Sequence, residues 1–176
     1  MREHEAFLKQ ARSDYRVFRR LLAEDRKQIP SCHPLHYLQM SAEKLAKAIK
    51  LASGDDEFDR YSHVAFTHLP TLLGRRDLAS KIGITNFKRF QSFLRRAKPI
   101  FRGVDELNPS VGPSSGTNDG PNTEYPWKSR DPMGKELWIA PTDHRFDVML
   151  QLQSADGVLV RELVESLLDR FEGIFP

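Results

Sequence analysis

Hydrophobic positions between residues 32 and 54 repeat with the period of an α-helix. Apolar residues stand at 35, 38, 42, 45, 49 and 52, and this alternation of three and four places them on one helix face. Pro34 suits a first helical turn, and Gly54 suits the position just past a helix end. The pattern predicts a helix with an apolar side for a core. Its polar side carries His36, Gln39, Met40, Glu43, Lys47 and Lys50.

The same period predicts a long helix over residues 3–28, which Pro30 would terminate. Its apolar stripe consists of Leu8, Ala11, Tyr15, Phe18 and Leu22. A second stripe is rich in arginine and consists of Arg12, Arg16, Arg19, Ala23 and Arg26. Arginine forks match phosphate oxygens, so the second stripe is a candidate phosphate track. The alternative is an ordinary solvated helix face.

Further helices are predicted over residues 69–81, 86–98 and 158–172. In the second of these the aromatic residues share one seam, and Pro99 would end or kink the helix. Its basic residues lie away from the seam and fit either solubility or RNA binding: Lys88, Arg89, Arg95, Arg96 and Lys98. Residues 144–153 alternate as a strand would, with residues 136–140 as a hairpin partner, but a helix is favoured because helices surround them.

Residues 108–135 are rich in proline and glycine and predict a long irregular segment. We expect disorder from Ser110 to Asn118, whereas Tyr125 and Trp127 should dock onto the helices and pin the segment. The sum is an all-α fold over residues 1–176. We expect a single domain, an antiparallel bundle of about five helices with one long Pro/Gly-rich loop before the last helical section.

Charge is distributed unevenly along the chain. Residues 1–103 carry 21 Lys and Arg against 11 Asp and Glu, a balance of +10, whereas residues 104–176 carry 6 against 13, a balance of −7. Either a basic surface binds a polyanion, or the two parts attract each other in a dimer or a folded monomer.

Cys32 is the one cysteine, so an internal disulfide is excluded. No window reaches the apolar length of a membrane span, and the N-terminus opens onto an amphipathic pattern rather than a signal peptide. We therefore expect a cytoplasmic protein without membrane contact.

The central helix carries the run Gln39-Met40-Ser41-Ala42-Glu43-Lys44-Leu45-Ala46-Lys47-Ala48. This run resembles the second-helix motif of HEPN domains, written loosely as Q-x-A-x-E-K-x-x-K-A. Asp14-Tyr15, Ser62-His63 and Tyr125-Pro126 resemble the family's flanking segments. The resemblance implies an all-helical, commonly dimeric bundle. Many members are metal-independent ribonucleases or toxins of prokaryotic conflict systems, and others are RNA-binding, nucleotide-binding or assembly modules.

Catalytic HEPN members carry an arginine and a histidine four to six residues apart near the last helices, and this chain departs from that pattern. His144 has no arginine before it at that spacing, and the one suitable pair, Arg26 and His33, lies between the first two helices. His63 is the other candidate. We therefore expect weak or absent nuclease activity.

Metal and cofactor sites are not expected. Cys32, His33 and His36 lack the second, separated ligand pair that zinc sites normally show. Walker loops and dinucleotide fingerprints are also missing.

The sequence thus predicts an RNA- or nucleotide-associated HEPN-like module, a homodimer in a prokaryotic defence, stress or toxin–antitoxin system. The alternatives are an active metal-independent ribonuclease and a structural subunit that acts only through a cognate partner protein. The candidate binding residues are Arg12, Arg16, Arg19, His36, Gln39, Glu43, Lys47, Tyr125 and Trp127.

Overall fold

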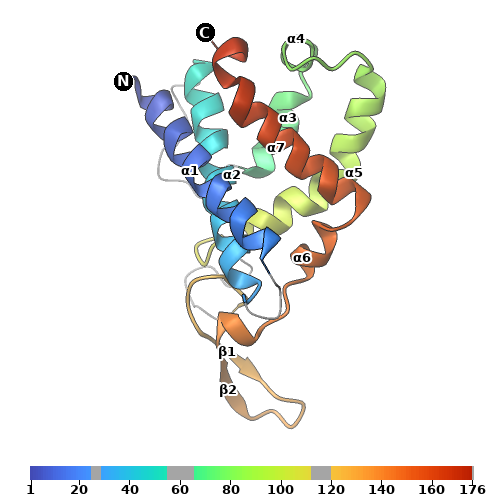
Figure 1. The fold of residues 1–176 in the computed structure, drawn as a ribbon. Helices are drawn as coiled ribbons and strands as arrows, with labels where there is room; N and C mark the ends of the chain where they lie inside the picture. Colours follow the sequence, from blue (N-terminus) through green and yellow to red (C-terminus); the bar gives the residue numbers. More distant parts are fainter. Residues whose placement is uncertain (25–28, 55–65, 112–119, 176) are drawn as a thin grey trace.

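The computed structural model describes residues 1–24, 29–54, 66–111 and 120–175 (Figure 1). Four long helices dominate this part of the chain: α1 (Glu3–Ala23), α2 (Cys32–Ala52), α5 (Phe87–Asp105) and α7 (Ala155–Ile174). Three helices are short: α3 (Leu69–Leu73), α4 (Arg76–Lys81) and α6 (Asp147–Gln151). Two 3-10 turns, η1 (Phe66–His68) and η2 (Pro141–Asp143), precede α3 and α6. The prediction of an all-α helical bundle is confirmed.

The antiparallel pair of α1 and α2 follows the predicted apolar stripes. Leu8, Ala11, Tyr15 and Phe18 of α1 are buried, and so are Leu35, Leu38, Ala42, Leu45 and Ile49 of α2. The Ser41 hydroxyl donates a hydrogen bond to the Ala11 carbonyl at 2.9 Å. Small side chains at these positions allow the two backbones to approach closely, so a side chain bonds directly to the facing helix.

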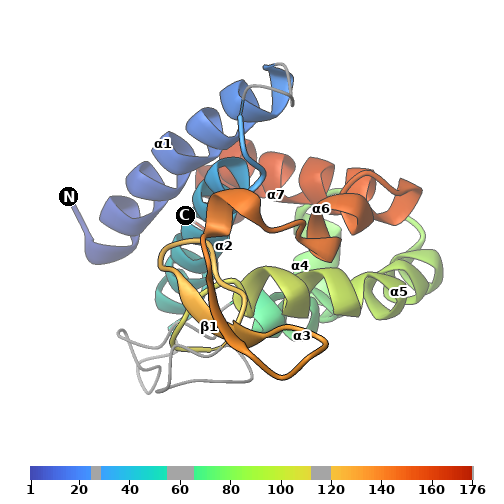
Figure 2. The same ribbon diagram turned by 90° about the horizontal axis from the view of Figure 1, so that it is seen from below.

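The second half of the core lies between α5 and α7, which both pack on the rest of the bundle. Seen from below, α1 and α5 lie on opposite sides of the body with α2 and α7 between them (Figure 2). Phe66 and Phe101 place their ring centroids 4.7 Å apart, and Phe171 and Phe175 place theirs 4.8 Å apart. One buried cluster joins residues of all these elements.

Several predicted helix boundaries differ from the observed ones. The first helix, predicted over residues 3–28, ends at Ala23. The segment predicted as one helix over residues 69–81 forms the two helices α3 and α4, which Gly74 separates. Pro99 does not end α5, which continues to Asp105. The proline ring is exposed and costs one backbone hydrogen bond, whereas Ile100, Phe101 and Val104 beyond it are buried and hold the helix on the core. The last helix begins at Ala155, three residues earlier than predicted.

Residues 147–151 form α6, so the preference for a helix in the ambiguous segment 144–153 is confirmed. Residues 136–139 do form a strand, β2 (Glu136–Ile139), but its partner precedes it. The partner is β1 (Trp127–Arg130), and the two strands are antiparallel with Trp127 opposite Ile139 and Arg130 opposite Glu136. The hairpin projects from the end of the helical body opposite the two termini (Figure 1).

The prediction of one irregular segment over residues 108–135 is wrong at β1, while residues 120–126 contain neither helix nor strand. The expected disorder of Ser110–Asn118 falls largely on residues 112–119, outside the described part. A side chain closes the hairpin turn, because the Asp131 carboxylate accepts hydrogen bonds from the backbone N–H groups of Met133 and Lys135, both at 2.9 Å. Gly134 supplies the positive φ of 82° that this turn requires.

Candidate functional site

Three of the predicted binding residues, Gln39, Glu43 and Lys47, form a buried polar row along α2. Lys47 Nζ lies 2.6 Å from Glu43 Oε1, and Gln39 Nε2 donates to Glu43 Oε2 at 3.2 Å. All three side chains are buried, and the Lys47 ammonium lies 5.9 Å from the centroid of the Phe7 ring. The i,i+4 pair expected between Glu43 and Lys47 is confirmed. Because the row is inside the bundle, it stabilises the helices and offers no open surface to a polymer.

Asp105, at the end of α5, adds a buried carboxylate that the sequence analysis missed. It accepts hydrogen bonds from the Phe66 N–H at 3.2 Å, the Thr67 N–H at 2.6 Å and the Thr67 hydroxyl at 2.5 Å, and so ties η1 to α5. Burial raises the pKa of Asp105 to about 6, the hydrogen bonds from Thr67 and Phe66 oppose this rise, and the negative charge of Glu43 adds to it. The available sequence signal was an acidic residue on the apolar face of a helix.

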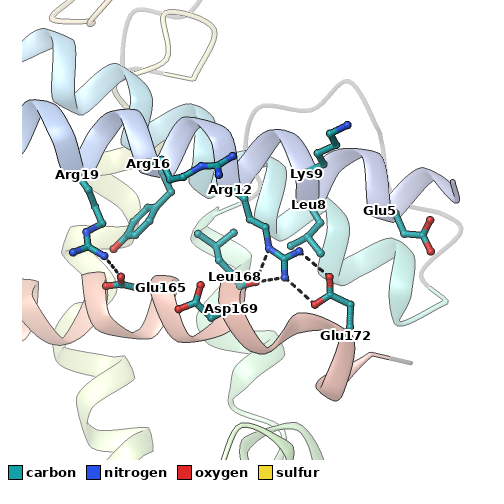
Figure 3. A pocket seen from close by; sticks show the side chains of 11 residues that line it. Glu5, Leu8, Lys9, Arg12, Arg16, Arg19, Glu165, Leu168, Asp169 and Glu172 are labelled. Atoms are coloured by element: carbon teal, nitrogen blue, oxygen red, sulfur yellow. Dashed lines mark hydrogen bonds and ion pairs between the residues drawn. The ribbon is translucent and has the colours of Figure 1, made fainter.

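The predicted phosphate track on α1 is largely occupied by carboxylates of α7 (Figure 3). The Arg12 guanidinium forms two hydrogen bonds with Glu172, at 2.7 and 2.8 Å, and two with the Leu168 carbonyl, at 2.6 and 2.9 Å. Arg19 pairs with Glu165. The hydrogen bond from Arg12 lowers the pKa of Glu172. Ion pairs within the chain therefore occupy the guanidinium groups of Arg12 and Arg19, although Arg19 remains exposed to solvent.

Arg16 differs from its neighbours, because among the described residues its side chain has no hydrogen-bond or ion-pair partner. It lines a groove of about 320 Å³ between α1 and α7 together with Lys9 and Asp169. Arg12 and Arg19 point toward α7 in Figure 3, whereas Lys9 points away from it. The groove thus holds charges of both signs, and two of its four cations, Arg12 and Arg19, are paired with carboxylates of α7.

The candidate catalytic residues are not brought together in the described part. His33 is exposed in the first turn of α2, and Arg26 and His63 lie outside the described residues. His36 is half-buried, and its Nδ1 lies 3.8 Å from Glu124 Oε1 in the segment that leads to the hairpin. His36 therefore faces a carboxylate of its own chain.

The two aromatic residues expected to pin the loop behave differently. Trp127 is buried and packs edge-on against His144, with ring centroids 5.1 Å apart, and against Phe146. Tyr125 is 54% exposed. The expectation of docking is right for Trp127 and wrong for Tyr125, since β1 begins at Trp127 and turns that side chain toward η2 and α6.

A basic surface remains on α5, which contains six Lys and Arg residues and one acidic residue, the buried Asp105. All six cations are exposed: Lys88, Arg89, Arg95, Arg96, Lys98 and Arg102. Arg96 is bound by Asp156 at 2.9 and 3.0 Å, and Arg102 lies 2.6 Å from Glu106. Within the described ranges the side chains of the other four have no hydrogen-bond or ion-pair partner.

Four of these cations share one line along the helix, and we call Lys88, Arg95, Lys98 and Arg102 the α5 stripe. Their spacing of seven, three and four residues returns to the same face. From the first to the last, the α5 stripe extends over about 21 Å at 1.5 Å per residue. It is a linear array of positive charge with no carboxylate of α5 on its face.

Comparisons with protein-family models, with curated proteins and with solved structures find nothing that matches this chain. None of the helices in the described ranges combines the length and apolar character needed to cross a membrane. In the same ranges, histidine, cysteine and acidic side chains form no cluster of three or more that would suit a metal ion.

Proposed function

We propose that this chain is a HEPN-like helical module that binds RNA through the α5 stripe. The observation that carries the proposal is that Lys88, Arg95 and Lys98 have no hydrogen-bond or ion-pair partner among the described residues, on a helix whose own acidic residue, Asp105, is buried. On α1, by contrast, Arg12 and Arg19 pair with carboxylates of α7. A row of uncompensated charges suits a polyanion whose phosphates repeat at short intervals.

The HEPN-like run, residues 39–48, supports the proposal by stabilising the helical bundle rather than by contacting RNA. Gln39, Glu43 and Lys47 hold α2 in the bundle from inside, so ligand binding falls to the outer helices. In this proposal the module serves a prokaryotic defence, stress or toxin–antitoxin system, as the resemblance implies.

Salt-dependent RNA binding tests the proposal. Labelled single-stranded RNA is titrated in EDTA with wild type, with Lys88→Ala/Arg95→Ala/Lys98→Ala, and with Lys9→Ala/Arg16→Ala/Arg20→Ala as a control that removes three exposed cations from α1. Each phosphate contact on a single strand contributes about −0.7 to the slope of log K against log salt. The α5 variant should therefore lose about 2 units of slope, and the control should keep the wild-type slope. Equal losses in both triple variants, or no binding by wild type, contradict the proposal.

The same gels test for ribonuclease activity. Cleavage by wild type in EDTA that Arg26→Ala/His33→Ala or His63→Ala abolishes would make the chain a metal-independent ribonuclease. We expect shifted but intact RNA, because the arginine and histidine pair of the catalytic HEPN members is missing from the last helices.

A protein-binding role is the second candidate, and one surface favours it. A groove of about 440 Å³ between α5 and α7 is lined by apolar side chains that include Ile84, Phe90, Phe93, Leu159 and Leu163. Leu159 is 44% exposed at its edge. A Leu159→Asp variant that changes the sedimentation of the pure protein would assign this groove to a homodimer contact. Binding of a cognate partner protein that the same variant abolishes would assign it to that partner.

A further inference from the structure

The β1–β2 hairpin has one face toward the helical body and one face toward solvent. Trp127 and Ile139 are opposite each other and pack inward. Lys128 is opposite Trp138 on the other face, because side chains alternate along a strand. Trp138 is 66% exposed, whereas Trp127 is buried. The hairpin therefore presents a tryptophan ring outward on the strand that lies farther along the chain.

One cation lies against the exposed ring, and a second is on the same face of the hairpin. Lys128 Nζ lies 5.6 Å from the centroid of the Trp138 ring. Arg130 is on the same face, where it is opposite Glu136, with 3.7 Å between Arg130 Nη2 and Glu136 Oε1. Lys128 Nζ also lies 4.0 Å from Glu136 Oε2. One carboxylate faces two cations, so this outward face combines an indole ring with a net positive charge.

The base of the hairpin is anchored next to the end of α5. The Thr123 N–H donates to the Leu107 carbonyl at 3.2 Å, four residues before β1 begins and two residues after α5 ends. The α5 stripe ends at Arg102, five residues before Leu107. An RNA strand that follows the α5 stripe toward the C-terminal end of α5 therefore approaches the base of the hairpin.

We propose that the outward face of the hairpin stacks an unpaired base of single-stranded RNA on Trp138, with Lys128 and Arg130 contacting the adjoining phosphates. This inference rests on the proposed RNA binding by α5 and names the class of RNA. Every base has a π-face that stacks on an indole ring, and cations beside such a ring hold the backbone, so a single strand gains from both. A duplex hides its base faces and gains only from the charges.

The chemistry of the tip favours a nucleic acid over a lipid surface. Met133 is 91% exposed at the turn, but the acidic Asp131 is two residues before it and Glu136 follows in β2. Trp138 is on the side of the hairpin rather than at its tip, where an inserting side chain would be placed. A flexible strand can reach that side face.

Affinity measurements with Trp138 variants test the inference. A labelled 12-nucleotide single-stranded RNA and the duplex of the same sequence are titrated with wild type, Trp138→Ala, Trp138→Phe and Met133→Ala. Loss of one stacked base should weaken single-strand binding by about 5- to 100-fold in Trp138→Ala. Trp138→Phe should keep most of the affinity. Met133→Ala, which removes a still more exposed apolar side chain from the hairpin turn, should keep all of it. Duplex binding should be the same for all four proteins.

Tryptophan fluorescence gives an independent readout, since Trp127 is buried and Trp138 is exposed. Single-stranded RNA should quench the wild-type emission and leave that of Trp138→Phe unchanged. Trp138→Thr introduces a β-branched residue, which favours strands, and replaces the alanine variant if that one unfolds.

Several outcomes overturn the inference, and they differ from failure of the proposed function. RNA binding that depends on the α5 stripe but is equal for wild type and Trp138→Ala removes the hairpin and leaves the α5 proposal standing. Absence of RNA binding by wild type removes both. A blue shift of the Trp138 emission on vesicles of phosphatidylcholine and phosphatidylserine, without an effect of Trp138→Ala on RNA, assigns the hairpin to a membrane surface instead.

Discussion

Asp105, in the last turn of α5, accepts hydrogen bonds from the backbone N–H groups of Phe66 and Thr67 and so connects α5 to η1. The Asp105 side chain is buried, and the negative charge of Glu43 acts on it, so the ionised form destabilises the fold. Its oxygens are nevertheless needed as acceptors for the hydrogen bonds from η1. This single residue therefore makes the stability of the bundle depend on pH.

The unfolding free energy should fall with rising pH because of Asp105. Burial raises its pKa from the ordinary value of 3.8 to about 6, so between these values the folded chain binds more protons than the unfolded chain. The stabilisation is complete below pH about 4 and lost above pH about 6, a change of about 3 kcal/mol.

Urea unfolding of wild type and Asp105→Asn at pH 4.5 and pH 7 measures this effect. The difference between the two proteins should change by about 2 kcal/mol in favour of the variant as the pH rises. Carboxylates with lowered pKa, such as Asp156 and Glu172, are common to both proteins and cancel. Parallel pH curves for the two proteins would contradict the assignment.

Tyr125 and Trp127 are two residues apart, yet substitution should affect them very differently. Trp127→Ala removes a buried ring from the contact with His144 and Phe146 and should cost about 3–5 kcal/mol of unfolding free energy. Tyr125→Ala removes an exposed ring and should stay within about 0.5 kcal/mol. Denaturant titrations decide, and a comparable loss in both variants would refute the buried position of Trp127.

At the scale of elements, the corner between α6 and α7 depends on close backbone approach. Ser154 begins α7 by accepting a hydrogen bond from the Gly157 N–H at 3.1 Å. A Cβ atom on Gly157 would lie 2.1 Å from the Gln151 carbonyl oxygen and 2.5 Å from Leu152 Cα. Only a glycine lets α6 fold back so tightly on the first turn of α7.

Two glycines of α7 therefore predict opposite effects of the same substitution. Gly157→Ala should destabilise by about 1–3 kcal/mol or more, because backbone atoms must move to make room. At Gly173 the added Cβ would meet nothing within 4 Å, so alanine should stabilise the helix by up to about 1 kcal/mol. Thermal unfolding of both variants checks the pair, and a tolerated alanine at position 157 would contradict the geometry of the corner.

The long helices were predictable from sequence, whereas the pairing of the two short strands was not. α1, α2, α5 and α7 each repeat an apolar face over five turns or more, so the helical period is unmistakable. β1 and β2 have four residues each, too few to establish a period of two inside a segment rich in proline and glycine. The helix end predicted near Pro99 was wrong because burial of Ile100, Phe101 and Val104 outweighs the loss of one backbone hydrogen bond at the proline.

The same distinction applies to the candidate site. The Glu43–Lys47 pair was predictable because both partners are four residues apart on one helix. The pairing of Arg12 with Glu172 joins residues 160 positions apart, and no local pattern reports it. The α5 stripe was visible as a basic face, but its lack of partners among the described residues required the packed structure.

At the scale of the molecule, ion pairs connect the basic part of the chain to the acidic part. Arg12 with Glu172, Arg19 with Glu165 and Arg96 with Asp156 each join a cation before residue 104 to a carboxylate after it. Of the two explanations for the charge split, attraction within a folded monomer accounts for these pairs. The surplus of positive charge is then left mainly on α5.

Removal of one paired arginine and one unpaired arginine from α1 tests this account. Arg12→Met keeps the apolar stem, loses the contacts with Glu172 and Leu168, and should cost about 1 kcal/mol in low salt. Arg16→Met should change stability by less than about 0.5 kcal/mol. The Arg12 effect should shrink in 1 M NaCl because the pair is partly exposed and is screened. Equal effects of both substitutions would argue against the pairing.

The seam between α1 and α7 also sets an order of events while the chain is being made. The helices α1 and α2 can pair as soon as both have left the ribosome. Arg12 can pair with Glu172 only after the 160 residues that follow Arg12 have been synthesised. At typical synthesis rates of 5–20 residues per second this delay is on the order of 8–30 s. During that interval Arg12 and Arg19 lack their carboxylate partners, and completion of α7 is the step that pairs both arginines.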